Sequence, residues 1–112
     1  MNIKIDRIAS NFIKEISYIL ANEVKDPDVK FVTVTDCKVT NDLSYAKVYV
    51  TVFDQNKIKD TLKALNNAKG FIRNELMDRV DVRHVPELEF VYDESIEYGK
   101  KIEDIIEKIH ED

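Results

Sequence analysis

Basic side chains gather around one of the two glycines in the sequence. Lys69 and Arg73 flank Gly70, and the surrounding stretch of residues 63–84 holds five bases and three acids. Where a helix begins, such a cluster lets guanidinium groups and backbone amides meet phosphate. Ordinary solvated surface charge is the alternative, and the residue types alone leave both interpretations open.

A second basic set lies near the N-terminus. Lys4, Arg7 and Lys14, together with Asn11, follow the spacing i, i+3, i+7 and i+10. On a helix this spacing lines up side chains along one stripe, which here lies outside the apolar face. We therefore include the three bases among the candidate phosphate contacts.

Aromatic residues hardly enter the basic stretch. Phe71 is the one example, and we interpret it as packing. Tyr45 and Tyr49 share one face of a predicted strand, where the sequence leaves open whether they are exposed or half-buried, as tyrosines in hairpins commonly are. Proteins that read single strands stack bases on aromatic rings, so the pattern favours recognition of backbone and shape over base reading.

Catalytic candidates are few. His84 and His110 are the only histidines, and neither has a partner at a metal-ligating spacing. Cys37 alternates with polar neighbours inside a predicted strand, which is typical of a small buried residue. The acidic pairs at 93–94 and 103–104 are interpreted as a solvated face and a helix cap. We expect no enzyme, no cofactor and no metal site.

The hydrophobic pattern predicts the elements that position these residues. Apolar spacings of three and four from Ile5 to Leu20 predict an opening helix, which Pro27 ends. Alternating β-branched and aromatic residues predict strands over 31–39 and 45–53. The pattern further predicts a turn over 40–44, a helix over 57–77, a strand over 88–92 and a final amphipathic helix over 95–110.

Gly70 interrupts the longest of these helices. A glycine inside a helix costs about 1 kcal/mol relative to alanine, so we predict a kink or break near Gly70. The resulting order is α-β-β-α-kink-α-β with an additional C-terminal helix. Three strands covered by helices predict an α+β fold in the form of a two-layer sandwich.

Length and charge set the class of protein. The chain has 112 residues, 44% of them hydrophobic, one cysteine and a net charge of −5. It has no secretory signal and no membrane-spanning run, so we expect a single intracellular domain. The negative charge is uneven: residues 85–112 carry a net −7, whereas residues 1–84 carry +2.

Four stretches make the chain resemble a known family. The element order is similar to a type II KH domain, with Ala68, Lys69 and Gly70 standing where that domain has its GXXG loop. Together with the stretches below, the chain resembles the bacterial ribosome-binding factor A family over about residues 7–98. The stretches are 24–27 (VKDP), 32–35 (VTVT), 42–50 (DLSYAKVYV) and 85–93 (VPELEFVYD).

The resemblance implies a type II KH-like domain over residues 1–94, followed by an acidic helical extension over 95–112 that can be partly disordered. It implies a cytoplasmic, non-catalytic ribosome assembly factor, which binds the small ribosomal subunit and assists late maturation of its rRNA near the 5′ end. It also implies cold adaptation, a monomer without a membrane partner, and a GTPase as a candidate further partner. The usual four-nucleotide clamp of the GXXG loop is not carried over.

The resemblance assigns an RNA-binding role to Ala68, Lys69, Gly70 and Arg73, and it matches Arg7 to a basic position of the family's first helix. With the charge pattern added, the expected RNA-binding residues are Lys4, Arg7, Lys14, Ala68, Lys69, Gly70, Arg73, Arg79 and Arg83.

The alternative function is a general KH-like RNA-binding or protein-interaction module unrelated to ribosome assembly. In that case Ile102, Ile105, Ile106 and Ile109 of the terminal helix could dock into a partner's groove. The other interpretation of this apolar face is that it packs on the chain's own sheet.

Overall fold

The computed structural model describes residues 3–29 and 31–95 of the chain. Its elements follow the predicted order, and the predicted α+β fold is confirmed. They are α1 (Ile3–Asn22), η1 (Pro27–Val29), β1 (Val32–Val39), β2 (Tyr45–Val52), η2 (Gln55–Lys57), α2 (Ile58–Asn67), α3 (Lys69–Arg79) and β3 (Glu87–Tyr92). The helix predicted over 95–110 and the extension over 95–112 lie, beyond Ser95, outside the described residues.

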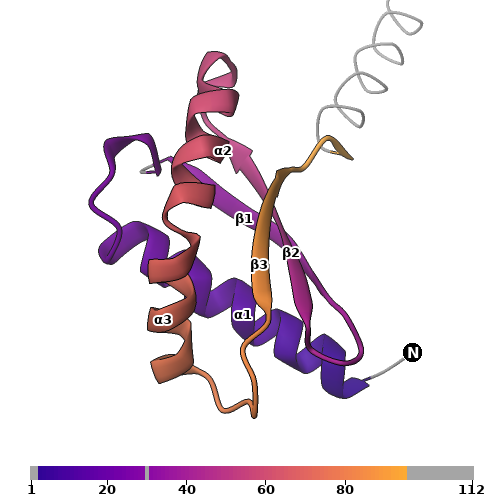
Figure 1. The fold of residues 1–112 in the computed structure, drawn as a ribbon. Helices are drawn as coiled ribbons and strands as arrows, with labels where there is room; N and C mark the ends of the chain where they lie inside the picture. The colour runs from indigo at the N-terminus through magenta and orange to yellow at the C-terminus, as the bar shows by residue number, and fades with distance from the viewer. Residues whose placement is uncertain (1–2, 30, 96–112) are drawn as a thin grey trace, which may run out of the picture.

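The described strands form one sheet in the order β1-β2-β3. β1 and β2 are antiparallel and joined by the predicted turn, whereas β2 and β3 are parallel. A parallel pair needs a crossover connection, and α2 and α3 supply it. Figure 1 shows α2 and α3 beside β3, while α1 crosses the sheet. This crossover brings the start of α3 next to the start of β3.

The core lies between the sheet and the described helices. α1 buries Phe12, Ile16 and Ile19, and each such side chain contributes roughly 1.5–3 kcal/mol of transfer free energy. Cys37 is buried as the strand pattern predicted. The core is completed chiefly by Leu20, Val34, Val48, Val50, Leu65, Ile72, Leu76, Leu88 and Phe90.

The predicted break near Gly70 is confirmed: the second helical segment divides at Ala68, between α2 and α3. Ala68 keeps right-handed torsion angles (φ −90°, ψ −1°), and its N–H donates to both Ala64 O and Leu65 O. The shared bond tightens the last turn of α2 and redirects the chain. Gly70 falls in the first turn of α3 and has no positive φ.

Only one face of the sheet is covered by described helices. Side chains of β2 alternate between buried Ala46, Val48 and Val50 and the more exposed Tyr45 and Lys47. We call the uncovered side the open face. Phe31 and Phe53, predicted as strand ends, lie just outside β1 and β2, where the Phe53 N–H donates to Phe31 O.

Within residues 3–29 and 31–95, no helix combines the length and apolarity that crossing a membrane requires.

Candidate RNA-binding groove

A hollow of about 220 Å³ lies between the start of α3 and the start of β3. It is lined by Lys69, Gly70, Arg73, Glu87 and Leu88, and we call it the α3 groove. Three of the residues expected to bind RNA therefore line one hollow. The crossover explains why, since it sets α3 against the strand that pairs with β2 from Tyr45 onward.

Arg73 forms one wall of the α3 groove with its guanidinium group fixed. Nε donates to Val85 O at 3.1 Å and to Pro86 O at 3.3 Å, and Nη2 donates to Val85 O at 2.8 Å. Both acceptors are neutral carbonyls, so the bonds orient the cation without cancelling its charge. Nη1 has no hydrogen-bond partner among the described residues. Arg73 is thus an oriented donor for an anion.

Lys69 and the first turn of α3 add further donors. The Lys69 side chain is exposed and has no ion pair or hydrogen bond within the described part of the chain. No side chain caps α3, whose first N–H groups precede the bond from Ile72 N to Ala68 O. Unsatisfied N–H groups and the helix dipole favour an anion at this position.

Gly70 is not required by the packing of the protein. A Cβ atom built at Gly70 would meet no atom within 4 Å, and the residue has no positive φ. What the missing side chain does provide is open access to the backbone at the start of α3. That access matters for a ligand that must approach closely, such as a nucleic-acid backbone.

Arg79 has a different environment, although it lies on the same helix. Its guanidinium group is 3.9 Å from the Glu15 carboxylate, 3.3 Å from that of Glu23 and 3.7 Å from that of Glu75. It also lies 4.8 Å from the ring centroid of Tyr18. Three carboxylates compensate the charge of Arg79. Glu15 lies in α1 and Glu23 directly follows it. Arg79 therefore joins α3 to α1.

The remaining expected residues lie apart from the α3 groove. Lys4, Arg7 and Lys14 are exposed on α1, and Arg83 is exposed in the connection between α3 and β3. None of these four side chains lines the hollow, and Ala68 precedes it at the helix junction.

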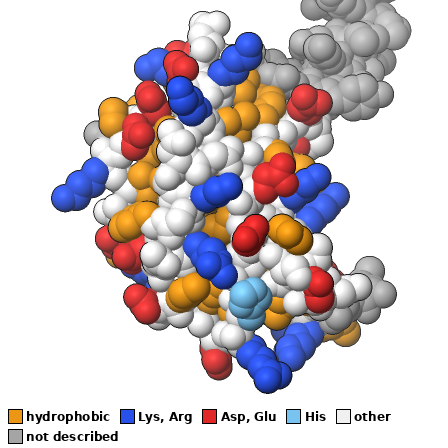
Figure 2. Space-filling model, in the orientation of Figure 1, with side chains coloured by type: hydrophobic (Ala, Val, Ile, Leu, Met, Phe, Trp, Pro, Cys, Tyr) orange, Lys and Arg blue, Asp and Glu red, His pale blue; other side chains and the backbone are white. Residues whose placement is uncertain are grey.

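Glu87 is a wall residue that the sequence reasoning missed. It is the exposed first residue of β3, and its carboxylate lowers the positive potential of the α3 groove. The signal for it was weak, because only the parallel pairing of β2 with β3 brings Glu87 to α3. Figure 2 shows the corresponding mixture, with positive and negative side chains interspersed on this face.

The other titratable groups of the described residues form neither a reactive thiol nor a metal site. Burial, together with the nearby Asp36 carboxylate, raises the pKa of Cys37 to about 12, so its sulfur stays a neutral thiol at pH 7. Within residues 3–29 and 31–95, no three His, Cys, Asp or Glu side chains lie together as metal ligands would.

The fold and the α3 groove define a small α+β domain of the KH-like class. The family model described as ribosome-binding factor A matches residues 4–106. The chain therefore belongs to the ribosome-binding factor A family.

Individual relatives agree with this assignment. The chain is 54% identical to the ribosome-binding factor A of Staphylococcus carnosus over 106 residues, covering 94% of this chain and 92% of the relative. It is 52% identical to that of Staphylococcus epidermidis over 110 residues, covering 97% and 95%.

Solved structures have the same fold. A crystal structure of ribosome-binding factor A from Thermus thermophilus superposes with a TM-score of 0.69 at 28% identity, covering 79% of this chain and 94% of that one. A homology model of the Thermus thermophilus protein, fitted into the cryo-EM map of a 30S complex, gives 0.60 at 27% identity, with coverages of 80% and 91%.

Proposed function

We propose that this protein binds rRNA of the small ribosomal subunit through the α3 groove and assists late maturation of that rRNA near its 5′ end. The protein holds the rRNA in an immature conformation. It therefore shifts the population of rRNA conformations and does not catalyse the cleavage of a bond. The proposal includes a cytoplasmic location, action as a monomer, a role in cold adaptation, and a GTPase as a further partner.

The observation that carries the proposal is the meeting of three features in one hollow. Lys69 supplies a cation that has no partner among the described residues, and Arg73 supplies one already oriented by two carbonyls. Gly70 leaves the uncapped start of α3 open. Each feature alone is common, but together they match the oxygen atoms and the negative charge of a phosphodiester backbone.

The choice of the small ribosomal subunit is supported by the relatives. The Thermus thermophilus protein, whose fold this chain shares, is described in a complex with the 30S subunit. Residues 1–84 of the sequence also contain 14 of the 17 basic side chains of the chain, which favours binding through this part.

Co-sedimentation with purified immature and mature small subunits, at low and high salt, tests the proposal. We expect binding that prefers the immature particle and weakens steeply with salt, because each phosphate contact releases counterions. Equal binding to unrelated RNAs of the same length would instead favour a general KH-like RNA-binding module.

A pair of matched variants tests the site itself. Lys69→Glu should lower the affinity for the immature subunit about tenfold and reduce the slope of log K against log salt by about one. Lys59→Glu makes the same charge change at an exposed residue ten positions earlier, on α2. It should have a much smaller effect, because salt screens charges beyond about 10 Å. Equal losses in both variants would contradict the assignment of the α3 groove.

A further inference from the structure

The open face ends in a pair of exposed aromatic rings. Phe31 is 72% exposed and Phe53 is 86% exposed, the two highest values among the large apolar side chains of the described residues. Their ring centroids lie 6.1 Å apart in a tilted arrangement. Single exposed apolar residues are ordinary, but adjoining rings form a patch, which we call the Phe31–Phe53 pair.

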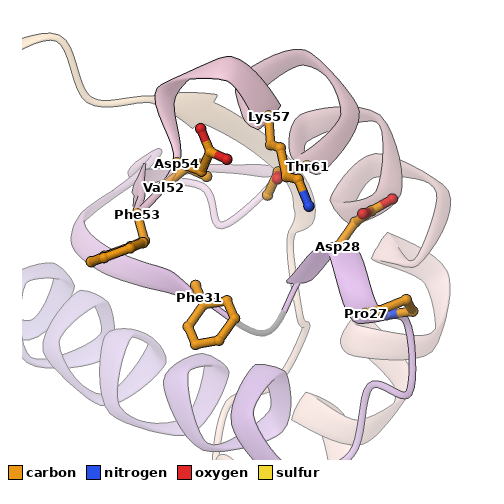
Figure 3. A pocket seen from close by; sticks show the side chains of 8 residues that line it. All are labelled: Pro27, Asp28, Phe31, Val52, Phe53, Asp54, Lys57 and Thr61. Carbon is orange, nitrogen blue, oxygen red and sulfur yellow. The ribbon is translucent and has the colours of Figure 1, made fainter.

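Hollows lie on both sides of this pair. One, of about 200 Å³, lies between the strand ends and α2 and reaches Thr61 and Lys57, as Figure 3 shows. The other, of about 420 Å³, lies over the strands between Thr33 and Thr51. Apart from the two rings, the second hollow is lined by valine and threonine only, so it can accept apolar side chains without burying a charge.

The chain leaves the sheet over this same surface. Asp93 follows β3, and its N–H donates to Val50 O of β2 at 2.8 Å. Its carboxylate accepts a hydrogen bond from Thr35 Oγ1 of β1 at 2.5 Å. Since β2 lies between β1 and β3, this bond crosses β2 on the open face. Ser95 N in turn donates to Asp93 Oδ1 at 3.0 Å, which fixes the last described residues there.

The residues after Ser95 have the length and pattern to cover the patch. Residues 96–112 number seventeen and place isoleucines at 102, 105, 106 and 109, a spacing that predicts one apolar side of a helix. Seventeen helical residues span about 25 Å, close to the length of an eight-residue strand. Asp93, three residues before the segment, is bonded to Val50, and Val50 lies three positions before Phe53 along the chain, so the patch is within reach of the segment.

We propose that residues 96–112 dock on the open face of their own chain, with the isoleucine side against the Phe31–Phe53 pair. This inference goes beyond the proposed function and does not depend on it. The segment carries six acids and three lysines.

Fluorine NMR of the full chain, with its five phenylalanines replaced by 4-fluorophenylalanine, tests the docking. A water-soluble gadolinium chelate added to the sample relaxes the exposed rings. We expect the Phe53 signal to be protected in the unchanged chain, and its relaxation to rise roughly twofold in the double variant Ile105→Asp with Ile106→Asp.

The chain supplies its own controls. Phe71, 46% exposed on α3, should relax equally in every variant. The buried Phe12 and Phe90 should stay protected, which verifies that the domain is folded. Lys108→Asp lowers the charge by two, as the double variant does, but off the isoleucine side, and it should leave Phe53 protected.

Three outcomes would overturn the inference. Phe53 could relax as fast in the unchanged chain as in the double variant, which would mean that nothing covers it. Its protection could instead grow with protein concentration, which would make a second copy the occupant. Protection that arises only after small subunits are added would assign the surface to a partner.

Discussion

The two ends of β2 present opposite chemistries on one sheet. At the Tyr45 end, β3 and α3 enclose the α3 groove, whose cation Arg73 is oriented by the carbonyls of Val85 and Pro86. At the other end, the Phe31–Phe53 pair is exposed and no described helix covers it. The difference follows from the crossover, because α2 and α3 pack beside β3 and leave the opposite face of the sheet bare.

A small acidic domain can bind phosphate at one end of its sheet. The α3 groove does not depend on an excess of positive charge across the surface, since positive and negative side chains alternate over that face. It depends on a few donors whose positions the backbone fixes. The Phe31–Phe53 end of β2 has no oriented cation of this kind among the described residues, so it favours apolar contacts.

The first prediction separates the cations of α3. Arg79→Ala removes a cation that is 26% exposed and contacts Glu15, Glu23 and Glu75, and it should destabilise the protein by about 2 kcal/mol. Urea unfolding followed by circular dichroism measures this. Arg83→Ala, at an exposed loop residue, should change stability by less than about 0.5 kcal/mol.

RNA binding by the Arg79→Ala protein completes this test. At temperatures where the variant is folded, its affinity for RNA should be close to that of the unchanged chain. An unchanged stability together with lost RNA binding would make Arg79 a groove residue, and the distinction drawn between Arg79 and Arg73 would then be wrong.

The second prediction asks whether Gly70 serves a ligand and not the fold. Gly70→Ala should stabilise the protein by about 0.5–1 kcal/mol, because alanine favours a helix and a Cβ there meets no atom within 4 Å. It should at the same time weaken RNA binding, because the new methyl group narrows access to α3. Unfolding and RNA titration of one preparation measure both effects.

Asn74→Ala is the matched control for Gly70. Asn74 is exposed on the same helix but does not line the α3 groove, so its replacement should raise helix stability with RNA affinity unchanged. If both variants bound RNA equally well, Gly70 would have no role in access to the groove.

The third prediction concerns the negative wall of the α3 groove. Glu87→Gln should raise the affinity for RNA by about threefold, because it removes a carboxylate that repels phosphate. Glu89→Gln makes the same change two residues along β3, where the side chain lines a different hollow beside Lys38 and Lys47. A filter-binding titration at fixed salt should separate the two variants.

Periodicity and local signals were sufficient to predict the fold. The apolar stripe of α1, the alternation in β1 and β2, and the weak helix formers after Leu65 all act within a few residues, so they can be read from the chain. The break predicted near Gly70 lies at Ala68, where the bonds of the Ala68 N–H to two carbonyls decide its position and the freedom of Gly70 does not.

The candidate site was less accessible to sequence reasoning. Lys69 and Arg73 could be proposed from their types, but the partners of Arg73 and Arg79 depend on contacts between distant residues. The carbonyls of Val85 and Pro86, and the carboxylates of Glu15 and Glu23, come from segments 12 to 64 positions away. No spacing rule shows that one arginine meets neutral oxygens and the other meets charged ones.

The last prediction addresses the anchor at the aromatic end, and it carries the smallest effect. A hydrogen bond from Ser95, and after it one from Thr35, lowers the pKa of Asp93 below its ordinary value. A carboxyl group with a lowered pKa in the folded state stabilises that state above the unfolded value of about 3.9. This contribution is lost as the pH falls through the folded pKa, and it is small because Asp93 lies near solvent.

Carbon-detected NMR titration of the aspartate carboxyl groups measures this pKa directly. Ser95→Ala should raise it the most and Thr35→Val somewhat less, in the order of the two causes. Asp42, whose pKa is lowered by Ser44 and Thr40 at the Tyr45 end, should respond to neither variant. If Thr35→Val left Asp93 unchanged, the bond across β2 would be absent in solution. The chain would then lose the side-chain contact that directs it over the open face, and the bond from the Asp93 N–H to Val50 O would still tie it to β2.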